Sequence, residues 1–136
     1  VVGVDIEIRP HNRAAIEAHE LSPMIKLVEG DSASPAVVAQ AAAEVRAGDV
    51  VLVILDSNHS RDHVRRELEA YAPLVSPGSY LLVLDTVVED LPAEAFPDRP
   101  WGPGDNPKTA LRAYLGLLGS EGRRAAHRPA EARQRG

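Results

Sequence analysis

The sequence predicts an α/β fold in which helices alternate with the strands of an open parallel sheet. Apolar runs of strand length are separated by stretches with helical periodicity, in the order β-α-β-α-β-α-β, followed by a loop and a last helix. This alternation is typical of parallel sheets, in which each crossover helix packs back onto the sheet. The clearest unit runs from Asp49 to Asp85, where two apolar runs flank one amphipathic helix.

The composition limits the classes of protein that the chain can belong to. Its 136 residues form one domain at most, and its net charge of -5 argues against a nucleic-acid partner. The absence of cysteine excludes disulfides and thiolate metal sites. No run approaches the roughly 20 apolar residues of a membrane span, and no signal peptide is visible, so we expect a cytoplasmic location. Because the chain begins at Val1 within a strand-like run, we expect a piece of a longer protein.

The first half of the chain predicts two strands and two helices. Strands are expected over residues 2–8 and 25–29, where β-branched and other apolar residues gather. A short helix should begin at His11 or Asn12, and a second should begin at Pro35, which suits the first turn of a helix.

The central unit predicts the remaining two strands. The unbroken apolar run at 50–55 indicates a strand buried on both faces, and residues 80–84 form a similar run. Between them, Ser60 can cap a helix whose apolar stripe includes Val64 and Leu68. We expect all four strands to form one parallel sheet with helices on both faces.

The C-terminal part predicts less regular structure. Residues 86–107 are rich in proline and glycine, which favours a loop, and 107–118 have the apolar spacing of a helix. Residues 119–136 hold five arginines against two glutamates without apolar periodicity, so we expect a disordered basic tail. The domain would then span residues 1–118.

Two aspartates are the leading candidates for chemistry. Asp56 and Asp85 each end a predicted strand, and the carboxyl ends of parallel strands meet at one edge of a sheet, where open α/β folds bind ligands. Taken singly, either acid could be a turn residue. Together they would repel each other unless a cation compensates them, and carboxylates without thiolates suit Mg²⁺.

Other candidates lie near the same edge. Glu7 lies near the end of an earlier predicted strand, at a place where an acid holds a ribose diol in nucleotide-binding folds, and Asp5 competes for that role. Ser32 could cap a helix or contact a ligand base. His59 could be a surface residue or a general base. Trp101, the only tryptophan, lies in a loop and suggests a lid or a binding element.

Longer motifs carry a family resemblance. GVDIEIRPHNR, VEGDS, LDSNHSRDHVRRELEAYAPLVSPGSYLLVLDT and FPDRPWGPGDNPKTALRAYL resemble the cephalosporin hydroxylase/rhamnosyl O-methyltransferase-like family over about residues 2–116. The resemblance implies a Rossmann-like fold, S-adenosylmethionine and Mg²⁺. It implies that Glu7 binds the cofactor ribose, that Asp31 and Ser32 flank the adenine, and that Asp56 and Asp85 bind the metal.

The sequence also departs from this family. Relatives carry an acidic pair at the second metal position, whereas Leu84 and Thr86 flank Asp85 here. The family's first strand, with its glycine-rich cofactor loop, would precede Val1, and its last strands would follow Leu118. In the doubly wound order that first strand lies between the strands at 2–8 and 50–55, so the predicted sheet is incomplete at its centre.

These observations lead to one functional hypothesis and its alternatives. We expect part of an S-adenosylmethionine-dependent O-methyltransferase that acts with Mg²⁺ on a hydroxyl of a sugar or other small molecule, with His59 as the base. The chain alone should be inactive and should bind the cofactor weakly or not at all. The alternative is a non-catalytic α/β remnant that binds no cofactor and that could form a homo-oligomer. A flavodoxin-like regulatory module does not account for the loop at 99–108.

Overall fold

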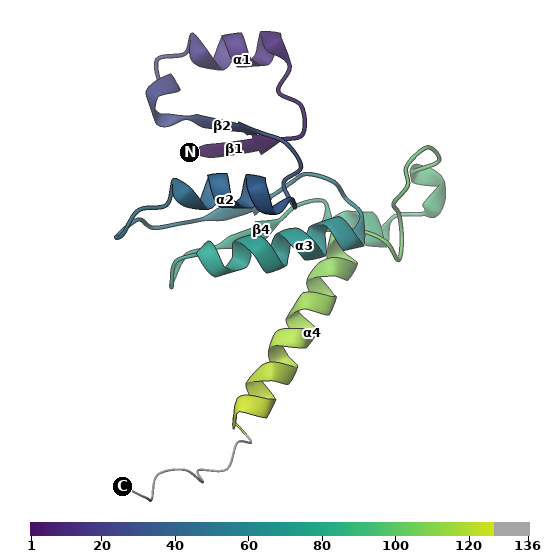
Figure 1. Cartoon of the computed structure of the whole chain (residues 1–136). Helices are drawn as coiled ribbons and strands as arrows, with labels where there is room; N and C mark the ends of the chain where they lie inside the picture. Colours follow the sequence, from purple (N-terminus) through teal and green to yellow (C-terminus); the bar gives the residue numbers. More distant parts are fainter. Residues whose placement is uncertain (127–136) are drawn as a thin grey trace, which may run out of the picture.

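The structure is a computed structural model that describes residues 1–126, with side chains for residues 1–119. Strands and helices alternate along this part of the chain (Figure 1), as the sequence predicts. The strands are β1 (Val2–Asp5), β2 (Lys26–Glu29), β3 (Val53–Leu55) and β4 (Leu81–Val83). The α-helices are α1 (Pro10–Glu17), α2 (Pro35–Ala43), α3 (Arg61–Tyr71) and α4 (Pro107–Ala126).

The prediction of one four-stranded sheet is wrong, because the described strands form two separate parallel pairs. β1 pairs with β2, with Val2 opposite Lys26, and β3 pairs with β4, with Val53 opposite Leu81. A cavity of about 570 Å³ lies between β1 and β3. The physical reason is the strand order: a doubly wound sheet places another strand between these two, and the described residues provide none.

The core lies where β3 and β4 meet the helices. Alternate residues of a strand point to opposite faces, so Val53, Leu55, Leu81 and Val83 pack on one face of the pair. Leu68 of α3 is fully buried against them. The central cluster of buried side chains is Ala41, Leu55, Val64, Leu68, Tyr71 and Ala110.

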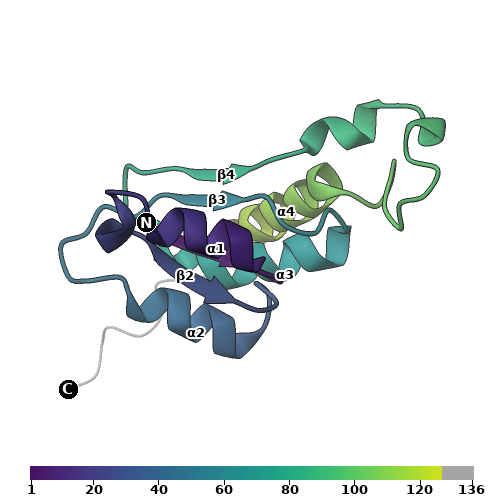
Figure 2. The ribbon, with the colours of Figure 1, turned by 90° about the horizontal axis from the view of Figure 1, so that it is seen from above.

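The two strand pairs differ in how helices cover them. Figure 1 shows β1 and β2 between α1 and α2, so this pair has a helix on each side. The other pair, β3 and β4, has α3 on one side, and Figure 2 shows no described helix on its opposite side. The apolar side chains that this leaves exposed are Val50, Leu52, Ile54, Tyr80, Leu82 and Leu84.

The last helix is longer than the sequence predicts. It continues beyond Leu118 to Ala126, through a stretch that contains no proline and ends in two arginines and two alanines, which favour helix. Residues 127–136 of the predicted disordered tail lie outside the described residues. Among the described helices, none combines the length and apolarity needed to cross a membrane.

Candidate functional site

The ends of β3 and β4 bring Asp56 and Asp85 together, as their sequence positions predict. Asp56 follows β3 directly, and Asp85 lies two residues beyond β4. The Leu84 N–H donates to the Leu55 carbonyl at 3.0 Å, which keeps the strands paired close to the two aspartates. Asp85 has a left-handed φ of 52°, which turns the chain out of the strand; aspartate adopts this conformation more readily than most residues.

His59 lies between the two carboxylates. Its Nε2 is 3.1 Å from Asp85 Oδ2 and 3.8 Å from Asp56 Oδ1. One potential ligand atom from each of the three residues lies within 4.8 Å of the others. The aspartate side chains are 53% and 45% exposed, so they are open to solvent, whereas His59 is 21% exposed. We call Asp56, His59 and Asp85 the open cluster.

A second group of polar side chains lies beneath the same edge, and we call it the buried cluster. Glu67 of α3 is 2% exposed, and its Oε1 accepts hydrogen bonds from Ser32 Oγ at 2.6 Å and Ser57 Oγ at 2.7 Å. His63 Nε2 lies 3.0 Å from Ser32 Oγ. Within the part of the chain with described side chains, Glu67 Oε2 has no hydrogen-bond partner. The buried cluster is Ser32, Ser57, His63 and Glu67.

The hydrogen bonds of the buried cluster make Ser32 a poor nucleophile. Its single hydroxyl proton goes to Glu67, so its oxygen accepts from the Nε2–H of His63. A serine nucleophile requires the reverse arrangement, in which the histidine accepts the serine proton. The Ser32–His63–Asp31 group therefore does not work as a hydrolytic triad, although His63 Nδ1 lies 3.9 Å from Asp31.

Tyr71 connects the buried cluster to the core. Its hydroxyl donates to the Ser32 carbonyl at 2.8 Å, which fixes the turn that carries Asp31 and Ser32. Burial raises the pKa of the Tyr71 phenol, and the nearby carboxylates of Glu67 and Asp31 raise it further. The phenol is therefore held in its neutral, donating form.

The proline- and glycine-rich loop is held in place by a buried asparagine. Asn106 is fully buried; its amide donates to the Gly102 carbonyl and to Glu89, and its oxygen accepts from the Thr109 N–H at the start of α4. The Gly104 N–H also donates to Glu89, and these bonds lower the pKa of that carboxyl. The loop is therefore an ordered part of the site.

This loop places Trp101 against the open cluster. The Trp101 ring lies 4.9 Å from the His59 ring and 5.3 Å from the Phe96 ring, measured between centroids. The Arg99 guanidinium lies 5.6 Å from the Trp101 ring centroid. The lid or binding role predicted for Trp101 remains a prediction, but its position beside His59 fits that role.

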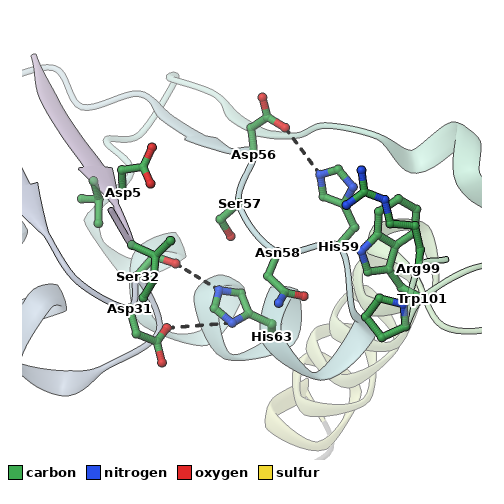
Figure 3. A pocket seen from close by; sticks show the side chains of 13 residues that line it. Asp5, Asp31, Ser32, Asp56, Ser57, Asn58, His59, His63, Arg99 and Trp101 are labelled. Carbon is green, nitrogen blue, oxygen red and sulfur yellow. Dashed lines mark hydrogen bonds and ion pairs between the residues drawn. The ribbon is translucent and has the colours of Figure 1, made fainter. Parts of the chain in front are cut away.

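A cavity of about 790 Å³ joins these features (Figure 3). Asp31, Ser32, Asp56 and His59 line it, as does Asp5. Glu7 is exposed and lies outside its lining, so the structure brings Asp5 rather than Glu7 to the cavity. Asp85 reaches the site through its contact with His59. The remaining lining residues are Val4, Ile6, Ser57, Asn58, His63, Arg99, Pro100 and Trp101.

Several of these residues are not identifiable as site residues from the sequence. His63 reads as a residue of the first helical turn, yet it lines the cavity. Glu67 falls among the charges of an amphipathic helix, and only its four-residue spacing from His63 gives any signal. The contacts that make both residues important come from Ser32, more than thirty residues away in the chain.

Fold and site together define a class: an α/β protein with acidic and histidine side chains gathered at the carboxyl end of parallel strands. The family model described as Rhamnosyl O-methyltransferase/CmcI matches residues 1–119. The chain therefore belongs to the rhamnosyl O-methyltransferase/CmcI family, which confirms the resemblance found in the sequence.

Individual relatives agree with the family assignment. Proteins named rhamnosyl O-methyltransferase from Mycobacterium tuberculosis and Mycobacterium bovis are 37% identical to this chain over 94 residues. The match covers 68% of this chain, and the chain spans only about a third of the relatives' length, 36%. No solved structure matches the chain.

Proposed function

We propose that this chain forms part of an S-adenosylmethionine-dependent O-methyltransferase that methylates a hydroxyl of a sugar or other small molecule with the help of Mg²⁺. Family membership supports methyl transfer. The observation that carries the proposal is the open cluster, whose ligand atoms lie within 4.8 Å of one another beside a cavity.

The open cluster has suitable donors for a magnesium ion. Asp56 and Asp85 offer carboxylate oxygens, and both side chains are exposed enough for water and substrate oxygens to complete the coordination. A bound Mg²⁺ would offset the repulsion between the carboxylates and make a coordinated hydroxyl easier to deprotonate. We assign the metal to these two residues.

His59 is the proposed general base. Its Nε2 faces both aspartates, so it is close to the place where a hydroxyl held between them would lose a proton. Trp101 packs against the ring and would keep His59 aimed at the acceptor rather than at bulk solvent. The base must be the neutral imidazole with Nε2 unprotonated, so the 3.1 Å contact with Asp85 would give way when the carboxylates bind the metal.

The cavity beside the open cluster is the proposed cofactor site. S-adenosylmethionine supplies the methyl group, and most of the rate enhancement would come from holding donor and acceptor in line. Asp31 and Ser32 line the cavity and are assigned to the adenine. We keep Glu7 as the ribose ligand proposed from the sequence, while Asp5 is the acid that lines the cavity.

A methyl-transfer assay tests the proposal. A longer protein that joins this chain to the segments its relatives carry would be incubated with labelled S-adenosylmethionine, a rhamnosyl glycoside and Mg²⁺, with and without a chelator. In that protein we expect chelator-sensitive transfer that Asp56→Ala lowers by about 100-fold or more, because a Lewis-acid metal contributes several kcal/mol. The chain alone should show little transfer. Asp98→Ala, which changes an exposed loop aspartate, is the control. Transfer undiminished by the chelator would remove the metal role from Asp56 and Asp85.

A second candidate function is a non-catalytic α/β module that binds no cofactor. The observation that favours it is the division of the strands into two pairs with a cavity between β1 and β3. Hydrogen bonds from Glu7 and Ser32, worth about 1 kcal/mol each, fall short of the roughly 4 kcal/mol of millimolar binding. Calorimetric titration with S-adenosylmethionine decides between the two. Micromolar, stoichiometric heat supports the enzyme, and absence of heat supports the module.

A further inference from the structure

Ser32 joins two halves of the described fold. One half, residues 1–45, holds β1 and β2, and the other, residues 50–119, holds β3 and β4. No described strand of one half pairs with a strand of the other. Among the described side chains, three hydrogen bonds cross between the halves, and all three run from α3 to Ser32. Helix α3 therefore fixes the turn after β2 to the rest of the site.

Three residues on one face of α3 make these bonds. His63, Glu67 and Tyr71 are four residues apart, and helical side chains at that spacing lie above one another. His63 Nε2 lies 3.0 Å from Ser32 Oγ, and Tyr71 donates to the Ser32 carbonyl at 2.8 Å. Glu67 accepts the Ser32 hydroxyl proton at 2.6 Å. Because that proton is committed to Glu67, the Ser32 side chain does not donate to a bound ligand.

Glu67 extends the connection to the turn after β3. Its Oε1 also accepts from Ser57 Oγ at 2.7 Å. Ser57 directly follows Asp56 of the open cluster, as Ser32 directly follows Asp31. We call residues 31–32 the cofactor turn and residues 56–57 the metal turn, and Figure 3 shows both beside the same cavity. A single buried oxygen atom therefore links the two turns.

The fold alone does not require a carboxylate at this position. Glu67 is 2% exposed, and its Oε2 has no hydrogen-bond partner among the described side chains. Burying a carboxylate with an unpartnered oxygen costs free energy, whereas an apolar residue of similar size fills such a place without that cost. What an apolar residue cannot replace is the acceptor that Ser32 and Ser57 share. The link itself is therefore the distinctive contribution of Glu67.

We propose that Glu67 is a positioning residue for methyl transfer, which holds the cofactor turn at a fixed spacing from the metal turn. This inference rests on the proposed function. Each turn keeps its own ligand contacts when the link is cut, so the binding of cofactor and metal is retained. Transfer requires the methyl donor and the acceptor hydroxyl in line, so a change of spacing lowers kcat and leaves KM nearly unchanged.

Amide hydrogen exchange tests the link in the chain itself. The N–H groups of Ala33 and Ser34 donate within the turn after β2, and that of Ser60 donates within the turn after β3. We expect Glu67→Leu to speed exchange at least fivefold at all three, because both turns lose the shared acceptor. Glu67→Gln keeps an accepting oxygen and should change exchange little. Glu69→Leu, on the exposed side of the same helix, is the control and should leave both turns unchanged.

Steady-state kinetics test the effect on transfer, in the longer protein that joins this chain to the segments its relatives carry. We expect Glu67→Leu to lower kcat at least thirtyfold, while KM for S-adenosylmethionine changes less than threefold. Glu67→Gln should stay within threefold of the unaltered kcat. A residue that only stabilised the fold would change the amount of folded protein and not the kcat of the folded fraction, which active-site titration determines.

A double-mutant cycle tests whether the two serines act through one link. Ser32→Ala and Ser57→Ala each remove one hydroxyl from Glu67 and leave Asp31 and Asp56 in place. Because either change breaks the same link, the double variant should lose no more kcat than the more affected single variant. Losses that multiply would show that the serines act independently and would overturn the proposal.

The outcomes distinguish this proposal from the proposed function. Absence of transfer by the unaltered longer protein would refute the methyltransferase assignment, and the role of Glu67 in transfer with it. Transfer with an unchanged kcat in Glu67→Leu would refute the positioning role alone. Faster exchange at only one of the two turns would show that Glu67 does not link them.

Discussion

The open and buried clusters contain the same types of group in opposite settings. In the open cluster, two exposed carboxylates converge on His59, and no Lys or Arg among the described side chains pairs with them. In the buried cluster, serine hydroxyls and a histidine surround Glu67. Converging exposed charges cost stability and suit ligand binding, whereas a hydrogen-bonded buried network stabilises the fold. Residues of the buried cluster would therefore position the site, and residues of the open cluster would act in it.

The largest effect on stability should come from the buried cluster. Glu67→Ala removes the buried acceptor shared by the hydroxyls of Ser32 and Ser57, and we expect it to lower the free energy of unfolding by about 2 kcal/mol or more. Urea unfolding measures this change. The control is Glu69→Ala, whose exposed pair with Arg65 should contribute less than about 1 kcal/mol. Equal losses in the two variants would contradict the distinction between the clusters.

Tyr71 should show a smaller effect with a characteristic pH dependence. Tyr71→Phe removes the bond to the Ser32 carbonyl and should cost about 1 kcal/mol at neutral pH. Burial and nearby carboxylates raise the folded-state pKa of the phenol above its unfolded value of about 10. This contribution to stability is complete below about pH 10 and is lost as the pH rises through the folded-state pKa.

Unfolding measurements across alkaline pH check this prediction. The stability difference between the unaltered chain and Tyr71→Phe should shrink above about pH 10, because only the unaltered chain must keep the Tyr71 phenol neutral in its folded state. A difference that grows with pH would show that the folded state favours the ionised phenol instead.

The smallest effect on stability should come from the open cluster. Asp85→Asn removes one of two like charges that are largely exposed, so we expect a change of less than about 0.5 kcal/mol, of either sign. Thermal unfolding without divalent cations measures it. A loss of stability as large as that of Glu67→Ala would mean that the open cluster stabilises the fold rather than binding a ligand.

The sequence predicts local structure well and long-range assembly poorly. The apolar runs locate all four described strands, and Asp56 and Asp85 are recognisable because each directly follows such a run. The strands are shorter than their runs: residues 50–52 are apolar, but β3 starts only at Val53, where pairing with β4 begins. Apolarity predicts burial potential, whereas strand length depends on the partner.

The contacts that complete the site could not be predicted in the same way. Glu67 looks like one more charge on an amphipathic helix until Ser32, thirty-five residues away, approaches it. Asn106 follows a Gly-Asp pair and resembles an ordinary turn residue, yet it is fully buried and connects the loop to α4. Both are single polar residues whose partners are set by packing, so no periodicity marks them.

The central claim is that the open cluster binds a divalent cation, and Mn²⁺ titration followed by electron paramagnetic resonance tests it directly. We predict that each chain binds one Mn²⁺ ion, which Mg²⁺ displaces. Asp56→Asn and Asp85→Asn should each weaken Mn²⁺ binding at least tenfold, and Asp98→Asn should leave it unchanged. Thermal unfolding of each of these variants, measured alongside, distinguishes lost binding from lost fold. Equal Mn²⁺ binding by the double variant Asp56→Asn/Asp85→Asn and the unaltered chain would contradict the account.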